Sequence, residues 1–111
     1  MGLYRLYTGA DGESHIEELK PSDHPDLWQL QTAAGIRLQE FKAKQFLDWH
    51  PAPRRQWVII VSGELEIGLG DGTSRRFGPG DARLVEDTTG RGHTTRTLGE
   101  GPCLALVVPL A

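Results

Sequence analysis

The sequence predicts an all-β protein that folds as one antiparallel sandwich or small barrel over residues 1–111. Its 14 glycines and 7 prolines are spread along the chain at short intervals. The segments between them alternate apolar and polar residues with a period of two, or form short runs rich in β-branched residues. No window has a helical period of useful length, and 111 residues is the size of a single compact domain.

The strands are predicted from these alternating segments, each bounded by turn residues. In chain order they cover residues 3–7, 27–30, 35–40, 56–62, 64–69, 74–77, 82–86, 93–98 and 104–108. The stretch LQEFKAKQFLDW at 38–49 could be mistaken for a helix, and we place its first half on a strand and its second half in a loop. We expect residues 1–34 to add strands and loops to a barrel formed by residues 35–111.

Turn chemistry supports hairpin connections between these strands. GLGDG at 68–72 contains part of a dinucleotide-binding pattern, but TSRRF follows it as a returning strand and no helix does. We therefore predict a tight hairpin there. The sequence Gly78-Pro79-Gly80-Asp81 predicts a second sharp turn, because proline fixes φ and glycine permits positive φ.

Composition and charge exclude several classes of function. The formal net charge is −3 and no basic block is present, so we expect no nucleic-acid partner. The apolar runs WVIIV and CLALVV are far too short to cross a bilayer, and MGLYRLYTGADGE lacks the pattern of a signal peptide, so we expect a cytoplasmic protein without a membrane partner. The single cysteine, Cys103, excludes an intramolecular disulfide and is expected to be an inert core thiol.

The segment 56–62 is apolar on both faces of its predicted strand. If Gln56, Val58 and Ile60 face the core, then Trp57 and Ile59 face the other side of the sheet. That outer face needs cover from elsewhere. A second subunit would supply it, and we expect a homodimer; the alternative is that the N-terminal segment lies over the strand in a monomer.

The histidines divide into two pairs by their surroundings. His15 and His24 lie in the acidic stretch GESHIEELKPSDHPD, which is typical of a solvated loop. His50 opens HPAPRRQW just before the most apolar strand, and His93 opens HTTRTL just after a loop punctuated by glycine. His50 and His93 are therefore the candidate catalytic residues, because imidazole can donate or accept a proton near neutral pH.

WHPAPRRQWVIIVSGELEIGLGDG followed by FGPGDARLVEDTTGRGHTTR resembles the two sequence motifs of the cupins, which are small β-barrel proteins. The first cupin motif is H-x-H, three or four residues, E, six residues and G. With Gly63 as its closing glycine, His50 matches the first histidine, Ala52 the second and Gln56 the glutamate. In the second motif Gly80-Asp81 matches the opening and His93 the histidine, while EDTTGRG replaces the Pro-x-Gly turn and the final asparagine is missing.

This resemblance implies an antiparallel double-stranded β-helix, or jelly-roll barrel, with its site inside. Cupins hold a divalent transition metal with three histidines and one glutamate directed into the barrel. The matching residues here are His50, Gln56 and His93, which could hold Mn, Fe, Ni, Co or Zn with a weaker, uncharged ligand set. The alternative is a polar pocket without metal, because Ala52 supplies no ligand and Glu64 and Glu66 are expected to point outward.

The remaining predicted pocket residues follow from alternation along the strands. We expect Val58, Ile60, Leu65, Ile67 and Leu84 to face inward and Thr95 to share the face of His93.

Two charged residues could also serve this pocket. Asp87 could orient an imidazole. Arg54 could reach the pocket mouth and bind a carboxylate, or it could be a surface partner of Glu64 or Glu66.

Two functions remain open at this point. One is a metal-assisted or acid/base enzyme, of the oxygenase or isomerase type, acting on a small polar or anionic molecule. The other is a ligand-binding or sensing module without metal.

Overall fold

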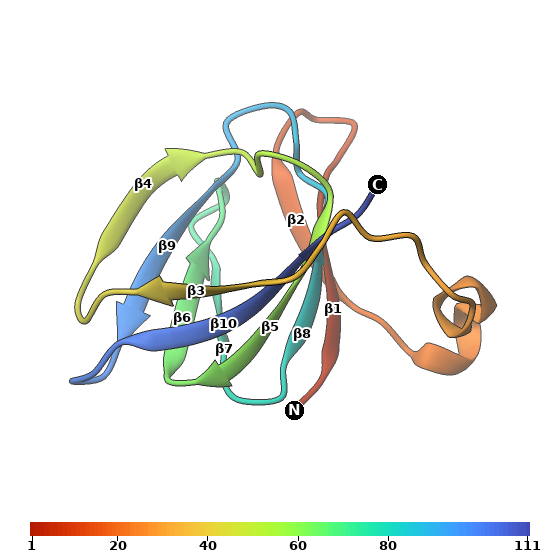
Figure 1. Cartoon of the computed structure of the whole chain (residues 1–111). Coiled ribbons are helices and arrows are strands. Elements are labelled where there is room, and N and C mark those ends of the chain that lie inside the picture. Colours follow the sequence, from red (N-terminus) through yellow and green to blue (C-terminus); the bar gives the residue numbers. More distant parts are fainter.

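The computed structural model describes residues 1–111, which form two β-sheets that face each other as the walls of a barrel (Figure 1). One sheet has six strands in the order β2-β1-β8-β5-β10-β3, and the other has four in the order β4-β9-β6-β7. The strands are β1 (Leu3–Thr8), β2 (Ser14–Glu18), β3 (Arg37–Phe41), β4 (Phe46–His50), β5 (Gln56–Ser62), β6 (Glu64–Gly68), β7 (Ser74–Phe77), β8 (Ala82–Val85), β9 (His93–Leu98) and β10 (Cys103–Pro109). Neighbouring strands are antiparallel except β1 and β8, which run parallel. The structure therefore confirms the predicted all-β jelly-roll class.

Three sequence predictions about the elements were wrong. Residues 27–30 are not a strand, because Pro21 and Pro25 each begin a 3₁₀ turn, η1 (Pro21–Asp23) and η2 (Pro25–Trp28). The polar stretch at 14–18 is strand β2, which pairs with β1 at the sheet edge and exposes its acidic residues. Residues 46–50 form β4 rather than a loop. Neither 3₁₀ turn is long or apolar enough to cross a membrane.

Both predicted turns are present. In the β6–β7 hairpin the backbone N–H of Leu69 donates to the carbonyl of Thr73, at 2.9 Å. The Gly78–Asp81 turn carries the chain from one sheet to the other, and there the carboxylate of Asp81 accepts a hydrogen bond from the backbone N–H of Gly78, at 2.8 Å. This second turn is tied to β5 near its far end, where the backbone N–H of Gly80 donates to the carbonyl of Ile60 at 3.0 Å.

The core lies between the sheets and is built from inward-facing apolar residues. Val58, Ile60, Leu65 and Ile67 are all buried there, as alternation predicts. Cys103 is also fully buried in this cluster, and burial raises the pKa of its thiol. The rest of the core cluster is Leu6, Phe41, Ala52, Phe77, Val85, Ala105 and Val107.

Strand β8 presents the opposite face from the one predicted. Its pairing with β5 places Arg83 opposite Val58 and Leu84 opposite Trp57. Because residues paired across a sheet share a face, Arg83 points into the barrel and Leu84 points out. Leu84 is buried on the outer side, in a pocket shared with Leu19 and Leu27 from the segment between β2 and β3. The prediction that Leu84 faces inward is therefore wrong.

The outer face of the six-stranded sheet is covered in part by the segment that carries η1 and η2. The indole Nε1 of Trp57 donates a hydrogen bond to Gln31 Oε1 at 3.1 Å, and Trp57 and Ile59 border an apolar groove of about 390 Å³. Beyond that groove the face is uncovered: Ile36 and Leu38, at the β3 edge, are each 70% exposed. The segment with η1 and η2 therefore covers one part of this face. A homodimer that covers the exposed part stays a prediction.

We expect the purified protein to sediment and scatter light as a dimer at micromolar concentration. Leu38→Asp should convert it to a monomer, because a charge cannot be buried in an apolar interface without a partner. Phe46→Asp, on the outer face of the other sheet, is the matched control and should remain dimeric. A wild-type protein that is monomeric at micromolar concentration would contradict the prediction.

Candidate functional site

A cavity of about 200 Å³ lies between the two sheets and opens at one end of the barrel. It is smaller than the range of about 300 to 1,000 Å³ that is usual for sites of drug-sized ligands, so it suits a small molecule. The residues around it come from both sheets and include five of the predicted site residues, His50, Gln56, Val58, His93 and Thr95. The full lining is Arg37, Gln39, Phe41, Leu47, His50, Ala52, Pro53, Gln56, Val58, Arg83, Val85, His93 and Thr95.

His50 and His93 meet because β4 ends where β9 begins. The two residues are paired across the β4–β9 ladder, and their rings are 4.7 Å apart between centroids with an angle of 58°. Gly92 makes this approach possible: its φ is +81°, and a Cβ there would collide with the carbonyl oxygen of His50. The glycine of the RGH sequence is thus required for the two histidines to share one wall.

His93 is held by a buried carboxylate. Its Nδ1 lies 2.6 Å from Asp87 Oδ2, and the hydroxyl of Ser14 donates to the same oxygen at 2.7 Å. Asp87 is fully buried and His93 is 5% exposed. A carboxylate accepts hydrogen bonds, so Nδ1 of His93 is the donor of this pair, and the tautomer of the ring that matches it has its lone pair on Nε2.

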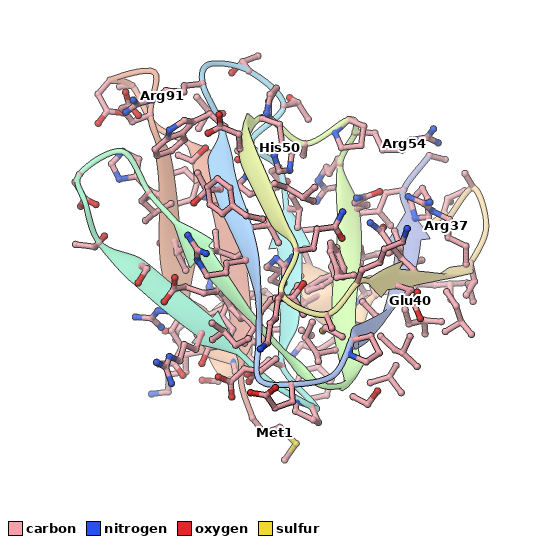
Figure 2. The ribbon with its side chains drawn as sticks, turned by 90° about the vertical axis from the view of Figure 1, so that its left-hand side faces the viewer. Met1, Arg37, Glu40, His50, Arg54 and Arg91 are labelled. Carbon is pink, nitrogen blue, oxygen red and sulfur yellow. The ribbon has the colours of Figure 1, made fainter.

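His50 is oriented by the backbone. Its Nδ1 lies 2.6 Å from the carbonyl oxygen of Asp48, which can only accept, so His50 also donates from Nδ1. Figure 2 shows His50 at the upper rim of the barrel, on β4. With Nδ1 of each ring donating, Nε2 is the nitrogen of each ring that can meet a ligand or exchange a proton.

The other predicted site residues occupy different places. Val58 and Thr95 line the cavity, Ile60 lies in the core without reaching it, and Asp87 stands behind His93. Arg54 is not brought to this cavity: it borders a separate shallow pocket with Gly35 and points away from the barrel (Figure 2). The cationic residue at the opening is instead Arg37 of β3.

Arg83 is a site residue that the sequence prediction missed. It lines the cavity from β8 and is 4% exposed, and its guanidinium carbon lies 5.0 Å from the centroid of the Phe77 ring. Its Nε and Nη1 are buried and have no hydrogen-bond partner in the protein. If Asp87 faces inward, alternation along the chain also places Val85 and Arg83 inward. The sequence prediction instead placed Leu84 inward because it is apolar, and this put Arg83 on the outer face.

Ser14 is a second residue that the sequence prediction missed, because the acidic neighbours of SHIEE are typical of a solvated loop. The alternation of polar and apolar residues in this segment is short, so it gives little sign that its first residue turns inward. Only the pairing of β2 with β1 brings this serine to the buried side of Asp87.

The donor set does not match what a divalent cation requires. No group of three or more His, Cys, Asp or Glu side chains is placed together to hold a metal ion. Two imidazole nitrogens and the unpartnered Oε1 of Gln56 line the cavity, but no carboxylate does, and the Arg83 guanidinium adds a positive charge. Anionic oxygen or sulfur ligands usually offset the cation's charge, and here none is available.

Glu86 anchors the chain just before Asp87 from the outer side. The Arg5 Nε donates to its Oε1 at 2.6 Å, and the Arg55 Nε donates to its Oε2. Burial opposes ionisation of Glu86, but these two hydrogen bonds outweigh it and lower the pKa of the carboxyl below its ordinary value. With Glu86 held outward, alternation directs Asp87 inward toward His93.

This chain resembles known proteins in its three-dimensional structure. No family model matches the sequence, and no curated protein matches it significantly. An uncharacterized conserved protein with a double-stranded β-helix domain from Klebsiella pneumoniae is similar, with a TM-score of 0.53 and 18% identity over 73% of this chain and 75% of the other.

Two further structures extend the comparison. The polyketide cyclase RemF from Streptomyces resistomycificus is similar with a TM-score of 0.58 and 20% identity, over 94% of this chain and 68% of the other. The CENP-C cupin domain of Drosophila melanogaster is similar with a TM-score of 0.51 and 13% identity, over 93% of this chain and 69% of the other. Together with the topology, these likenesses show that the chain has the cupin fold that its two motifs implied.

Replacing Asp87 tests how much the buried carboxylate contributes to the fold. We expect Asp87→Ala to lower the free energy of unfolding by about 3 kcal/mol, because it leaves His93 Nδ1 and the Ser14 hydroxyl buried without a partner. Asp87→Asn should cost less, since an amide oxygen can still accept from both. Urea denaturation followed by tryptophan fluorescence measures the change; Asp23→Ala, an exposed control, should stay within about 0.5 kcal/mol of wild type. Equal effects of Asp87→Ala and of the control would contradict this account.

The Glu86 network predicts a specific dependence of stability on pH. Because the pKa of Glu86 is lower in the folded than in the unfolded state, its contribution to stability is complete above the unfolded value of about 4.3 and is lost as the pH falls through the folded value. Glu86→Gln should therefore reduce the free energy of unfolding at pH 7 by about 1 kcal/mol, and the difference should shrink below about pH 4.

The matched control for this pH dependence is Glu100→Gln, which removes an exposed ion pair with Lys44. That variant should have little effect at either pH. A Glu86→Gln difference that is the same at about pH 7 and about pH 3 would contradict the assignment.

Proposed function

We propose that this protein is an isomerase-type enzyme that moves a proton on a small polar molecule, with His93 as its general base and without a resident metal. The observation that carries the proposal is the buried Asp87–His93 pair, at 2.6 Å, on the wall of the cavity between the sheets. A carboxylate behind an imidazole fixes its tautomer and stabilises the imidazolium that forms when the ring accepts a proton. A fully buried carboxylate destabilises a fold unless partners compensate it, and here one of its partners is the candidate base.

The cavity geometry supports one order of events. The neutral His93 ring accepts a proton from a carbon of the bound molecule at Nε2, while Asp87 accepts the hydrogen bond from Nδ1 and balances the new charge. The same nitrogen then returns the proton to a neighbouring atom, so that no proton is lost overall. His50, whose ring lies beside that of His93, is a second group that can accept or return a proton.

The metal-dependent chemistry implied by the cupin resemblance has less support. Ala52 and Gln56 stand where cupins have two of their ligands, and the positive charge of Arg83 in the same cavity disfavours a second cation. The metal therefore remains a prediction that elemental analysis can test, on protein purified without added chelator or metal.

A second candidate function is a ligand-binding module without catalysis. This alternative is favoured because Ala52 and Gln56 stand where cupins have two of their metal ligands, while the chain still has a cavity at this place. Fold alone cannot choose between these functions, because related barrels carry unrelated activities. The choice depends on whether a proton actually moves in the cavity.

Hydrogen–deuterium exchange into small carbonyl compounds tests the proposal directly. Pyruvate, 2-oxobutyrate, 2-oxoglutarate, dihydroxyacetone and acetone each have exchangeable C–H bonds next to a carbonyl, which proton NMR follows in D₂O. We expect the wild-type protein to accelerate exchange in at least one of them by about 100-fold or more, the usual contribution of a general base. His93→Gln should abolish the acceleration, and His24→Gln, a half-buried histidine between η1 and η2 that does not line this cavity, should not change it.

Two results would contradict the proposed enzyme. Exchange that survives in His93→Gln would remove His93 as the base, and no exchange with any compound would leave the binding module as the function. If a chelator abolished the exchange and Mn²⁺, Fe²⁺, Ni²⁺, Co²⁺ or Zn²⁺ restored it, the chemistry would be metal-assisted, as the resemblance to cupins implies.

A further inference from the structure

We infer that Arg83 makes this cavity a binding site for a small carboxylate, which the guanidinium holds at the wall of the barrel opposite His93. The inference rests on the proposed function in one respect: the carboxylate would bind in the same cavity in which His93 would act as the base. It adds the chemical class of the ligand and the residue that selects it. Neither the cupin motifs nor the histidines assign this role.

The position of Arg83 is the first part of the argument. Strand β8 belongs to the six-stranded sheet, and its register places Arg83 beside Val58, on the cavity side. His93 belongs to the four-stranded sheet that faces it. A ligand bound to both residues would therefore span the cavity from one wall to the other, with its anionic group at Arg83 and its reacting part at His93.

The lack of a protein partner for Arg83 is the second part. Two of its three side-chain nitrogens, Nε and Nη1, are buried without a hydrogen-bond partner. Phe77 contacts the guanidinium through its ring face, which offsets part of the charge but accepts no hydrogen bond at these nitrogens. Buried guanidinium groups are usually paired with an anion, because an unpaired buried charge is costly.

The charges around the cavity are the third part. Its lining contains two cationic residues, Arg83 and Arg37, and no acidic one. The carboxylate of Asp87 attracts Arg83 electrostatically, but it makes no hydrogen bond to the guanidinium: its Oδ2 accepts from Ser14 and lies next to His93 Nδ1, and its Oδ1 is unpartnered. Burial lowers the pKa of Arg83 to about 10, so the group still carries its positive charge near neutral pH. The residues that line the cavity therefore carry a net positive charge, which Asp87 behind His93 offsets only from a distance and which an anionic ligand would balance by direct contact.

The shape of the guanidinium and the size of the cavity indicate which anion it takes. A planar guanidinium matches a carboxylate through two parallel N–H to O hydrogen bonds. A phosphate group suits the same fork, but a cavity of about 200 Å³ leaves less room for a substrate attached to it. We therefore commit to a small organic carboxylate and treat phosphate as an arm of the test.

The test measures binding without requiring turnover. Isothermal titration calorimetry of the full chain near neutral pH would compare acetate, pyruvate, malonate, succinate and benzoate with the corresponding neutral amides and with inorganic phosphate. We expect at least one carboxylate to bind, and to bind at least about tenfold more tightly than its amide, since a charge-assisted hydrogen bond is about twice as strong as a neutral one. The Arg83 ¹⁵Nε–H resonance in an NMR spectrum should shift during the same titration.

Variants then assign the effect to Arg83. Arg83→Met, of similar length and without charge, should weaken carboxylate binding by about tenfold or more, while Arg83→Lys should retain part of it. Arg76→Met, a matched change on the outer face where Arg76 pairs with Glu64, should leave binding unchanged. If Arg83→Met does not fold, the shift of the Arg83 ¹⁵Nε–H resonance in wild-type protein during the carboxylate titration still decides the question.

The outcomes separate this inference from the proposed function. Binding of amides as tightly as carboxylates, or no binding by any carboxylate, would overturn the role of Arg83. Preference for phosphate over every carboxylate would overturn the choice of ligand class. Carboxylate binding that persists in His93→Gln, together with loss of proton exchange in that variant, is the result expected if both proposals hold. Carboxylate binding without any proton exchange in wild type would uphold Arg83 and refute the enzyme.

Discussion

The hydrogen bond between the buried carboxylate of Asp87 and Nδ1 of His93 is the interaction on which the site depends. It joins the loop after β8 to the start of β9, and Ser14 extends it to the edge strand β2. The backbone carbonyl of the same Asp87 accepts from Ala52 N–H at 2.9 Å, which fixes the segment after His50. Asp87 therefore sets the tautomer of His93 through its side chain, and through its backbone it fixes the segment that follows His50.

The two walls of the cavity have different chemical characters, and this difference supports the proposed chemistry. The four-stranded sheet contributes His93 and Thr95, with lone pairs and a hydroxyl that can handle protons. The six-stranded sheet contributes Gln56, Val58 and Arg83, which supply an amide, an apolar surface and a fixed positive charge. A barrel holds these groups at constant separation because both sheets share one packed core. Positioning of this kind is what a small substrate requires, since it has few atoms through which to be oriented.

Sequence reasoning predicted most of the fold because the strands that form the core are strongly patterned. Val58, Ile60, Leu65 and Ile67 alternate with polar or outward residues, and the turn at Gly78–Asp81 is specified by glycine and proline. It failed where local pattern and tertiary pairing disagree. Leu84 is apolar yet lies on the outer face, because the segment around Leu19 and Leu27 covers it there and Arg83 takes the inner position.

By itself the sequence determined the barrel, the meeting of His50 with His93, and the replacement of two cupin ligands by Ala52 and Gln56. The barrel follows from alternation and turn residues, which are local properties of the chain, and the other two are what the resemblance to the cupin motifs implied. Only the tertiary structure decided which strand faces enclose the cavity, because that depends on register between strands far apart in sequence. Register turned Arg83 inward and brought Ser14 to Asp87, and no local pattern in SHIEE or ARLVE specifies either contact.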